Sequence, residues 1–138
     1  MRVLLDTNVV VSAFIWGGTP HRLIAAAAAG DIELCSSPQL LSELREVIGR
    51  QHLASRLKSQ HASVERILAL YEEMVVLVSP GATPRVVPND SDDDHVIAAA
   101  VAAGADYIVS GDRHLLSMVT HEGINIVGPA ELVQRLGA

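Results

Sequence analysis

The sequence is poor in aromatic residues, contains one cysteine and has no long apolar run. Only 3% of its 138 residues are Phe, Trp or Tyr, so aliphatic side chains must fill the core. The lone Cys35 excludes an intrachain disulfide, which suits the reducing cytoplasm. No apolar run approaches the roughly 20 residues that cross a bilayer, and no signal-peptide pattern follows Met1. We therefore expect a cytoplasmic protein without a membrane segment.

Basic residues are also scarce: Lys and Arg number 10 against 16 Asp and Glu, a formal net charge of −6. Proteins that coat nucleic acids without sequence preference neutralise phosphates with Lys and Arg, and this composition argues against that class. It does not exclude an enzyme that acts on a nucleic acid through bound metal ions. With 49% apolar residues, the chain is long enough for one domain with its own core, which we expect to span residues 1–138.

Short apolar runs alternate with longer helical patterns along the chain. The expected strands are 3–5, 32–35, 75–78, 107–109 and 124–127, and the expected helices are 9–16, 20–30, 38–50, 63–74, 92–103 and a last one opened by Pro129. Residues 79–90, with three prolines, read as a loop. The strands are continuously apolar, which is typical of a parallel sheet buried on both faces. The pattern predicts a three-layer α/β/α sandwich.

Two aspartates follow predicted strands and two precede them. Asp6 comes directly after 3–5, and Asp112 follows 107–109 after a short Ser-Gly turn. Parallel strands place such residues at the carboxyl edge of the sheet, where ligand sites form in open α/β folds. Asp31 and Asp106 precede their strands and are expected at the opposite edge.

Helical rotation places two further acids, at about 100° per residue. In 38–50, Glu43 borders the apolar arc while Glu46 points further toward solvent, so Glu43 is the inward candidate; the alternative is a boundary glutamate in an ordinary salt bridge. Asp94 lies at the edge of the buried stripe of 92–103. Asp92 and Asp93 are interpreted as acidic first-turn residues that cap this helix.

The acids Asp6, Glu43, Asp94 and Asp112 are therefore expected to converge from two strand ends and two helices. Clustered carboxylates are hard to keep ionised together without a positive partner. Oxygen-rich acidic sites suit Mg²⁺ or Mn²⁺, ions that activate water and stabilise a leaving phosphate oxygen. The alternative is four separate surface carboxylates.

The motifs LLDTNVVVSAF, SPQLLSELREVI, NDSDDDHVIAAAVAAGADYIVSGDRHLL and INIVGPAELVQRL, taken in this order, resemble a PIN domain. The similarity is to the VapC-like toxins of type II toxin–antitoxin systems. It implies a parallel five-stranded sheet and a Mg²⁺- or Mn²⁺-dependent ribonuclease. It also implies an RNA substrate, a cognate antitoxin and a homodimer.

The resemblance also implies roles for individual residues. Catalytic and metal-binding roles fall on Asp6, Glu43, Asp94 and Asp112, and supporting roles on Thr7, Asn8, Asp90, Asp93 and Ser110. Ser110 stands where threonine is common, and it keeps the hydroxyl. No core acid of the motif set is missing.

The strongest basic stretch contains Arg50, Arg56 and Lys58, and Arg113 lies beside Asp112. These four are candidates for contact with RNA phosphates, with a solvated helical face as the more ordinary interpretation. Trp16, before Gly17-Gly18, could stack a base, but packing under the loop or at an interface is the favoured interpretation. The histidines have no zinc-binding spacing, and His95 and His114, which adjoin proposed acids, are expected to be exposed.

A rival hypothesis is a non-catalytic module that binds RNA or a protein partner, in which the acids serve only capping and solubility. A Toprim-like site is disfavoured because its D-x-D should follow an apolar strand, whereas Asp92-Asp93-Asp94 follows a Pro-rich stretch. A receiver-like domain would need an aspartate after the third strand, where Ser79 stands.

Overall fold

The computed structural model describes residues 1–60, 63–80 and 91–137, with backbone only at 51, 52, 54, 59 and 91–93. The strands are β1 Arg2–Leu5, β2 Glu33–Ser36, β3 Val75–Leu77, β4 Tyr107–Val109, β5 Thr120–His121 and β6 Ile124–Val127. The helices are α1 Thr7–Val11, the π-helical η1 Ser12–Trp16, α2 Gly18–Ala28, α3 Pro38–Ile48, α4 Gln51–Ser59, α5 Val64–Met74, α6 Ser91–Ala103, α7 Arg113–Met118 and α8 Pro129–Arg135.

The strands form one sheet in the order β3-β2-β1-β4-β6-β5. Four of the five strand pairings are parallel, and the fifth joins β5 antiparallel to β6 at the edge of the sheet. The sheet therefore has six strands rather than the expected five. The additional strand, Thr120–His121, is two residues long and is formed by the turn before β6. An element this short leaves no periodic pattern in the sequence.

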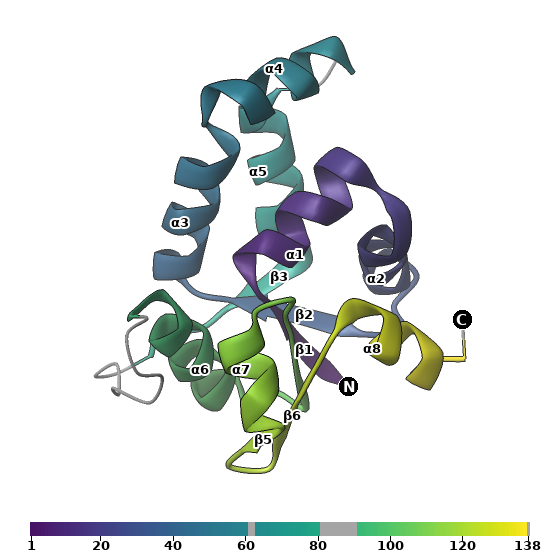
Figure 1. Ribbon diagram of the computed structural model, residues 1–138, viewed down its shortest axis with the longest axis vertical. Helices are drawn as coiled ribbons and strands as arrows, with labels where there is room; N and C mark the ends of the chain where they lie inside the picture. The colour runs from purple at the N-terminus through teal and green to yellow at the C-terminus, as the bar shows by residue number, and fades with distance from the viewer. Residues whose placement is uncertain (61–62, 81–90, 138) are drawn as a thin grey trace.

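Alternate residues of the strands pack into two separate cores. On β1, Val3 and Leu5 face the cluster that includes side chains of α1, α2, α3, α5 and α8. Leu4 faces the other cluster, which includes side chains of α6 and α7. Helices thus cover both faces of the sheet, as Figure 1 shows, and the predicted three-layer α/β/α sandwich is confirmed.

The chain order around the sheet creates a switch point between β1 and β4. From β1 the chain proceeds outward through β2 to β3, and α6 then returns it to β4 on the other side of β1. Helices α1 to α5 pack on one face and α6 and α7 on the other. In such sheets the crevice for a ligand opens beyond the carboxyl ends of the two strands that flank the switch.

Most predicted helices are present, and the main differences are short elements. The expected helix 9–16 begins earlier, at Thr7, and its second half is the π-helical η1, which ends at Gly17 with a φ of 75°. The sequence pattern predicts no element over α4 or α7. Both are short helices held by contacts with neighbouring elements, α4 by α3 and η1 and α7 by β6.

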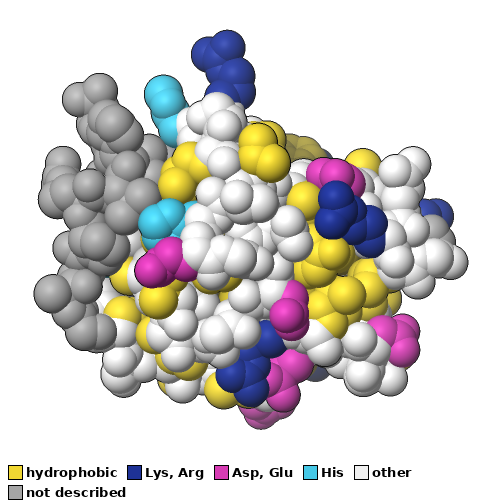
Figure 2. All heavy atoms as spheres, turned by 90° about the horizontal axis from the view of Figure 1, so that it is seen from below, with side chains coloured by type: hydrophobic (Ala, Val, Ile, Leu, Met, Phe, Trp, Pro, Cys, Tyr) yellow, Lys and Arg dark blue, Asp and Glu magenta, His cyan; other side chains and the backbone are white. Residues whose placement is uncertain are grey.

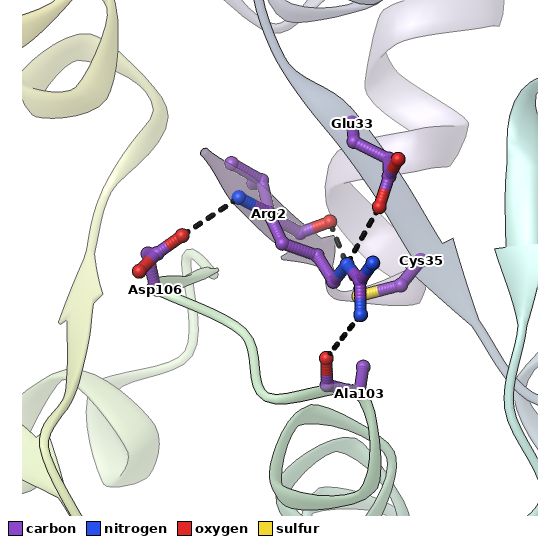
Figure 3. A network of polar contacts seen from close by, with 6 residues as sticks. Arg2, Glu33, Cys35, Ala103 and Asp106 are labelled. Carbon is purple, nitrogen blue, oxygen red and sulfur yellow. Dashed lines mark hydrogen bonds and ion pairs between the residues drawn. The ribbon is translucent and has the colours of Figure 1, made fainter.

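At the amino edge of the sheet, Arg2 joins three segments of the chain (Figure 3). Its backbone N–H donates to Asp106 Oδ2 at 2.8 Å, its Nε to Glu33 Oε1 at 2.6 Å, and its Nη1 to the Ala103 carbonyl at 2.6 Å. Asp106 therefore serves the start of β1, at the edge where the sequence placed it. Among the described residues, no helix is long and apolar enough to span a membrane.

Cys35 is enclosed in the core beneath this edge. It is 0% exposed, and its thiol donates to the Val3 carbonyl at 3.5 Å. Burial raises the pKa of Cys35 from 9.0 to about 12, so almost no thiolate forms near neutral pH. We expect the native protein to resist Ellman's reagent at pH 8 for hours, and one thiol to react after unfolding in urea. Labelling of the folded protein at the rate of a small free thiol would contradict this burial.

Among the described residues, Tyr71 is the one large polar side chain packed deep in the larger core. It is 2% exposed and forms an edge-to-face pair with Phe14, with ring centroids 6.1 Å apart. Within the described residues its hydroxyl has no hydrogen-bond partner, and burial raises its pKa. Because an unsatisfied buried hydroxyl costs about 1–3 kcal/mol, we expect Tyr71→Phe to raise the free energy of unfolding by roughly 1 kcal/mol.

Urea denaturation of the two proteins measures this difference. Tyr107→Phe is the matched control, because the Tyr107 hydroxyl accepts from Arg135 Nη1 at 3.1 Å on the exposed surface. We expect that change to stay within about 0.5 kcal/mol. A Tyr71→Phe protein that is less stable by 1 kcal/mol or more would mean that the hydroxyl has a partner.

Candidate active site

Asp6 and Asp112 lie at the carboxyl ends of the neighbouring strands β1 and β4, as the sequence predicted. The register pairs Leu5 with Val109, so the two strands end side by side. The Asp6 N–H donates to the Val109 carbonyl at 2.9 Å, which extends the ladder by one residue beyond β1. The Ser110 N–H likewise donates to the Val127 carbonyl at 3.0 Å. The backbone positions of Asp6 and Ser110 are therefore set by the sheet itself.

The Ser110 hydroxyl joins the two aspartates. Its Oγ accepts from the Asp112 N–H at 2.9 Å and donates to Asp6 Oδ2 at 2.8 Å. The other oxygen of Asp6, Oδ1, accepts from the Thr7 N–H at 2.8 Å. Asp6 is 6% exposed and Ser110 is 0% exposed. This small network holds a carboxylate in one orientation at the switch point of the sheet.

Both aspartates also begin helices. Asp6 is the N-cap of α1, and Asp112 is the N-cap of α7, where its Oδ1 accepts from the N–H groups of His114 and Leu115 at 2.7 and 3.4 Å. These bonds satisfy backbone donors that have no partner within the helix. Capping and a role in a site are compatible, because a carboxylate has two oxygens and each has two lone pairs.

Asp94 is more deeply buried than the sequence predicted. It lies in the first turn of α6 and is 0% exposed, whereas Val101, which shares its helical direction, is 43% exposed. Helix α6 packs against β1, β2, β4 and α3, and its residues from Val96 to Ala100 are all buried. A helix that is apolar on nearly all sides has no single buried stripe, so rotation alone does not rank its positions.

Glu43 lines a groove along α3. The predicted order of exposure holds: Glu43 is half-buried and Glu46 is exposed. The groove has a volume of about 530 Å³ and is lined by Pro38, Gln39, Ser42, Glu43, Glu46, Val47, Arg50 and His95. His95, the residue after Asp94, was expected to be exposed; it is half-buried and lines this groove together with Glu43.

The four predicted acids therefore lie near the same edge of the sheet without forming a closed cluster. Across the described ranges, no group of three or more His, Cys, Asp or Glu side chains is close enough to hold one metal ion. Asp6 and Asp112 are joined through Ser110, and Glu43 lines the groove beside α6. One signal in the sequence could have indicated the groove. Four of its polar residues are spaced so that they share one side of a helix: Gln39, Glu43, Glu46 and Arg50.

The supporting and basic candidates are distributed around this edge. Thr7 is buried beneath Asp6, whereas Asn8 is exposed on α1. Asp90 lies outside the described residues, and only the backbone of Asp93 is described, so the roles expected of both remain predictions. Arg50 lines the groove, Arg56 and Lys58 are exposed on α4, and Arg113 is exposed at the start of α7.

Comparison with solved structures supports the fold. The crystal structure of VapBC2 from Rickettsia felis, bound to a DNA fragment from their promoter, contains a chain similar to this one, with a TM-score of 0.62. The match covers 91% of this chain and 97% of that chain at 13% sequence identity, which shows a shared fold. No curated protein matches the sequence.

Comparison with protein families gives a match over most of the chain. The family model described as PIN domain matches residues 2–114, a range that contains the four predicted acids and the Ser110 network. This agrees with the resemblance of the sequence motifs and with the observed sheet. The chain belongs to the PIN domain family.

Proposed function

We propose that this protein is a metal-dependent ribonuclease that hydrolyses RNA phosphodiester bonds. The observation that carries the proposal is the hydrogen-bonded series Asp6–Ser110–Asp112 at the switch point, with Asp94 buried at the start of the helix that crosses there. Burial of carboxylates at the ligand-binding edge of a parallel sheet is typical of a functional site, because burying charge is costly for a purely structural role.

The side chains present fit a hard divalent cation. The donors at this edge are carboxylate and hydroxyl oxygens, which Mg²⁺ and Mn²⁺ prefer. A closed group of three protein ligands is not required, because Mg²⁺ keeps several waters and is commonly held by one or two carboxylates. Asp6 and Asp94 are the proposed direct ligands, and Glu43 and Asp112 are proposed to accept hydrogen bonds from the ion's waters or to hold a second ion. A bound cation would supply the positive charge that acidifies water and stabilises a leaving oxygen.

The residues of the chain orient the reaction. Ser110 and the Thr7 N–H fix the Asp6 carboxylate, so its lone pairs keep one direction when substrate enters. Water attacks phosphorus and gives up a proton to a carboxylate, the bond between phosphorus and the 3′ oxygen breaks, and the leaving oxygen takes up a proton from solvent water. Glu43 lines an open groove and can accept a proton from the attacking water, a role that suits a half-buried carboxylate.

The biological role proposed for this activity is that of a toxin paired with an antitoxin. The support is the motif resemblance to VapC-like toxins together with the fold shared with the VapBC2 structure. A cognate antitoxin and a homodimeric state belong to this proposal, as does action in the cytoplasm.

A second candidate function has one specific observation in its favour. Asp6 and Asp112 both cap helices, so stability alone could account for these two acids in a non-catalytic module that binds RNA or a protein. Capping does not account for the burial of Asp94 or for the link through Ser110, and we therefore favour the enzyme.

Neutralising the buried acids tests the proposal. We expect Asp6→Asn and Asp94→Asn to lower the cleavage of a panel of structured RNAs, in Mg²⁺ or Mn²⁺, by more than about 100-fold, the upper range for loss of a residue that only supports a ligand. EDTA should abolish cleavage by the wild-type protein. Thermal melting without metal should show Asp94→Asn as stable as wild type or more so, because the change removes a buried charge.

Asp31→Asn is the matched control, since Asp31 is exposed at the opposite edge of the sheet. It should cut like the wild type. Equal cutting by all variants would reveal a contaminating nuclease. A folded wild-type protein that neither cuts the panel nor binds Mn²⁺ would favour the non-catalytic module.

The link between the two aspartates can be tested separately at Ser110. Ser110→Ala removes one donor to Asp6 and the acceptor of the Asp112 N–H. We expect kcat to fall by roughly 10- to 100-fold with little change in KM, because Ser110 orients a ligand without contacting RNA. The free energy of unfolding should fall by about 1–3 kcal/mol, since a partly buried N–H loses its partner.

Ser110→Thr retains the hydroxyl and should recover most of the activity. Melting curves for both variants would detect crowding by the added methyl group at this fully buried position. If Ser110→Ala loses stability and keeps its full kcat, the network serves the fold and has no part in catalysis.

A further inference from the structure

Trp16 carries the only exposed aromatic ring of the protein. The chain has four aromatic residues, all in the described part: Tyr71 is buried, and Phe14 and Tyr107 are half-buried. Trp16, at the end of η1, is 59% exposed. In a sequence with so few aromatic residues, a large ring left in solvent at a helix end contributes little to the core.

The guanidinium of Arg56, on α4, lies over this ring. Its guanidinium carbon is 4.1 Å from the centroid of the Trp16 ring, a cation–π distance. Gln60 Nε2 donates to the Ile15 carbonyl at 3.3 Å and fastens the end of α4 to η1 beside the stack. With Arg56 over one face, the remaining exposure of Trp16 belongs to the other face and the ring edge. The ring therefore presents a flat surface in a fixed position, on which one planar group could stack.

The surroundings of the stack are basic. Residues 47–64 contain no Asp or Glu, although the chain carries a net charge of −6, and they contain Arg50, Arg56 and Lys58. Leu53 and Leu57 of α4 are buried, which leaves Arg56 and Lys58 on the outer side. The opposite end of the molecule differs: on the face seen from below, Lys and Arg side chains lie apart and several have acidic neighbours (Figure 2).

The basic segment begins at the candidate site. Arg50 lines the groove with Glu43, and α4 starts at the next residue and runs to the stack. On the other side, α1 and η1 run continuously from Asp6 to Trp16, which corresponds to roughly 15 Å at the rise of a helix. The stack is therefore separated from the acids by the length of a few nucleotides.

We propose that Trp16 and Arg56 form a stacking platform for a base of single-stranded RNA, at a distance from the cleaved bond. The inference rests on the proposed ribonuclease function and adds a substrate-binding position to it. A flat aromatic ring beside cationic side chains matches the two parts of a nucleotide, since the base stacks and the phosphate pairs with Arg or Lys. A protein surface that covered this patch would instead have to bury the charges of Arg56 and Lys58, which are exposed.

The experiment uses the intrinsic fluorescence of the protein, because Trp16 is its single tryptophan. Wild-type protein in EDTA is titrated with a short single-stranded RNA of mixed sequence and with an abasic ribose-phosphate oligomer of equal length. Stacking of a base should quench the emission in a saturable way with RNA and leave it nearly unchanged with the abasic oligomer. Equal quenching by both oligomers, or none with RNA, would overturn the platform.

Variants measure the contribution of the stack to binding. We expect Trp16→Ala to weaken RNA affinity roughly 5- to 150-fold, the range for losing one stacked base, and Trp16→Phe to lose less. Arg56→Lys keeps the charge but loses the planar group, so it should also weaken binding. Arg135→Ala, which removes the guanidinium 5.5 Å from the Tyr107 ring at another surface, should bind like the wild type.

Cleavage assays separate this inference from the proposed function. In Mg²⁺, Trp16→Ala should raise KM with little effect on kcat, because the platform holds RNA away from the reacting atoms. Cleavage without RNA-dependent quenching would overturn the platform and leave the ribonuclease. Quenching without cleavage would support the platform and count against the ribonuclease. A change of emission with protein concentration alone would assign the ring to a contact between two copies and overturn the proposal.

Discussion

The burial of a carboxylate where β1 and β4 end side by side is the constraint on which the site depends. Asp6 is 6% exposed, and a buried charge is tolerated only when hydrogen bonds replace the water it has lost. The Thr7 N–H and the Ser110 hydroxyl provide two of these bonds. The Ser110 oxygen also accepts from the Asp112 N–H, and this second bond orients the hydroxyl toward Asp6. The short Ser-Gly turn after β4 brings the Asp112 N–H to the Ser110 oxygen, and α7 begins directly after Asp112.

The same residues determine both the fold and the arrangement of the site. Helices α1 and α7 begin after Asp6 and Asp112, so the two strand-to-helix turns at the switch point are stabilised by the same acids that lie at the carboxyl edge of the sheet. The chain has few aromatic residues, and small and branched aliphatic side chains cover α6. They let α6 pack closely against the sheet and, on its flank, against α3. That close packing places Asp94 in the interior and leaves Glu43 in the open groove.

Topology made part of the site predictable from sequence. Asp6 and Asp112 were placed correctly because parallel strands share a carboxyl edge, and Glu43 was ranked above Glu46 because α3 has one apolar side. Helical rotation was less informative for Asp94, because α6 is apolar on nearly all sides. Helices α4 and α7 and strand β5 were missed because tertiary contacts, and not periodicity, hold such short elements. The groove could not be predicted from the sequence, because it joins His95 of α6 to residues of α3 that are distant along the chain.

A net charge of −6 is compatible with binding a polyanion when the charges are sorted in space. Screening limits the reach of exposed charges to about 8 Å at physiological ionic strength, so distant acids weigh little on a local contact. The acid-free segment that contains Arg50, Arg56 and Lys58 begins at the groove beside Glu43, while the carboxylates lie at the switch point. Substrate phosphates would then meet positive charge along α4 and reach the acids at a single point. An arrangement of this kind limits the affinity for nucleic acids in general. Selectivity for a substrate then depends on the few positions where a base or a scissile phosphate is bound.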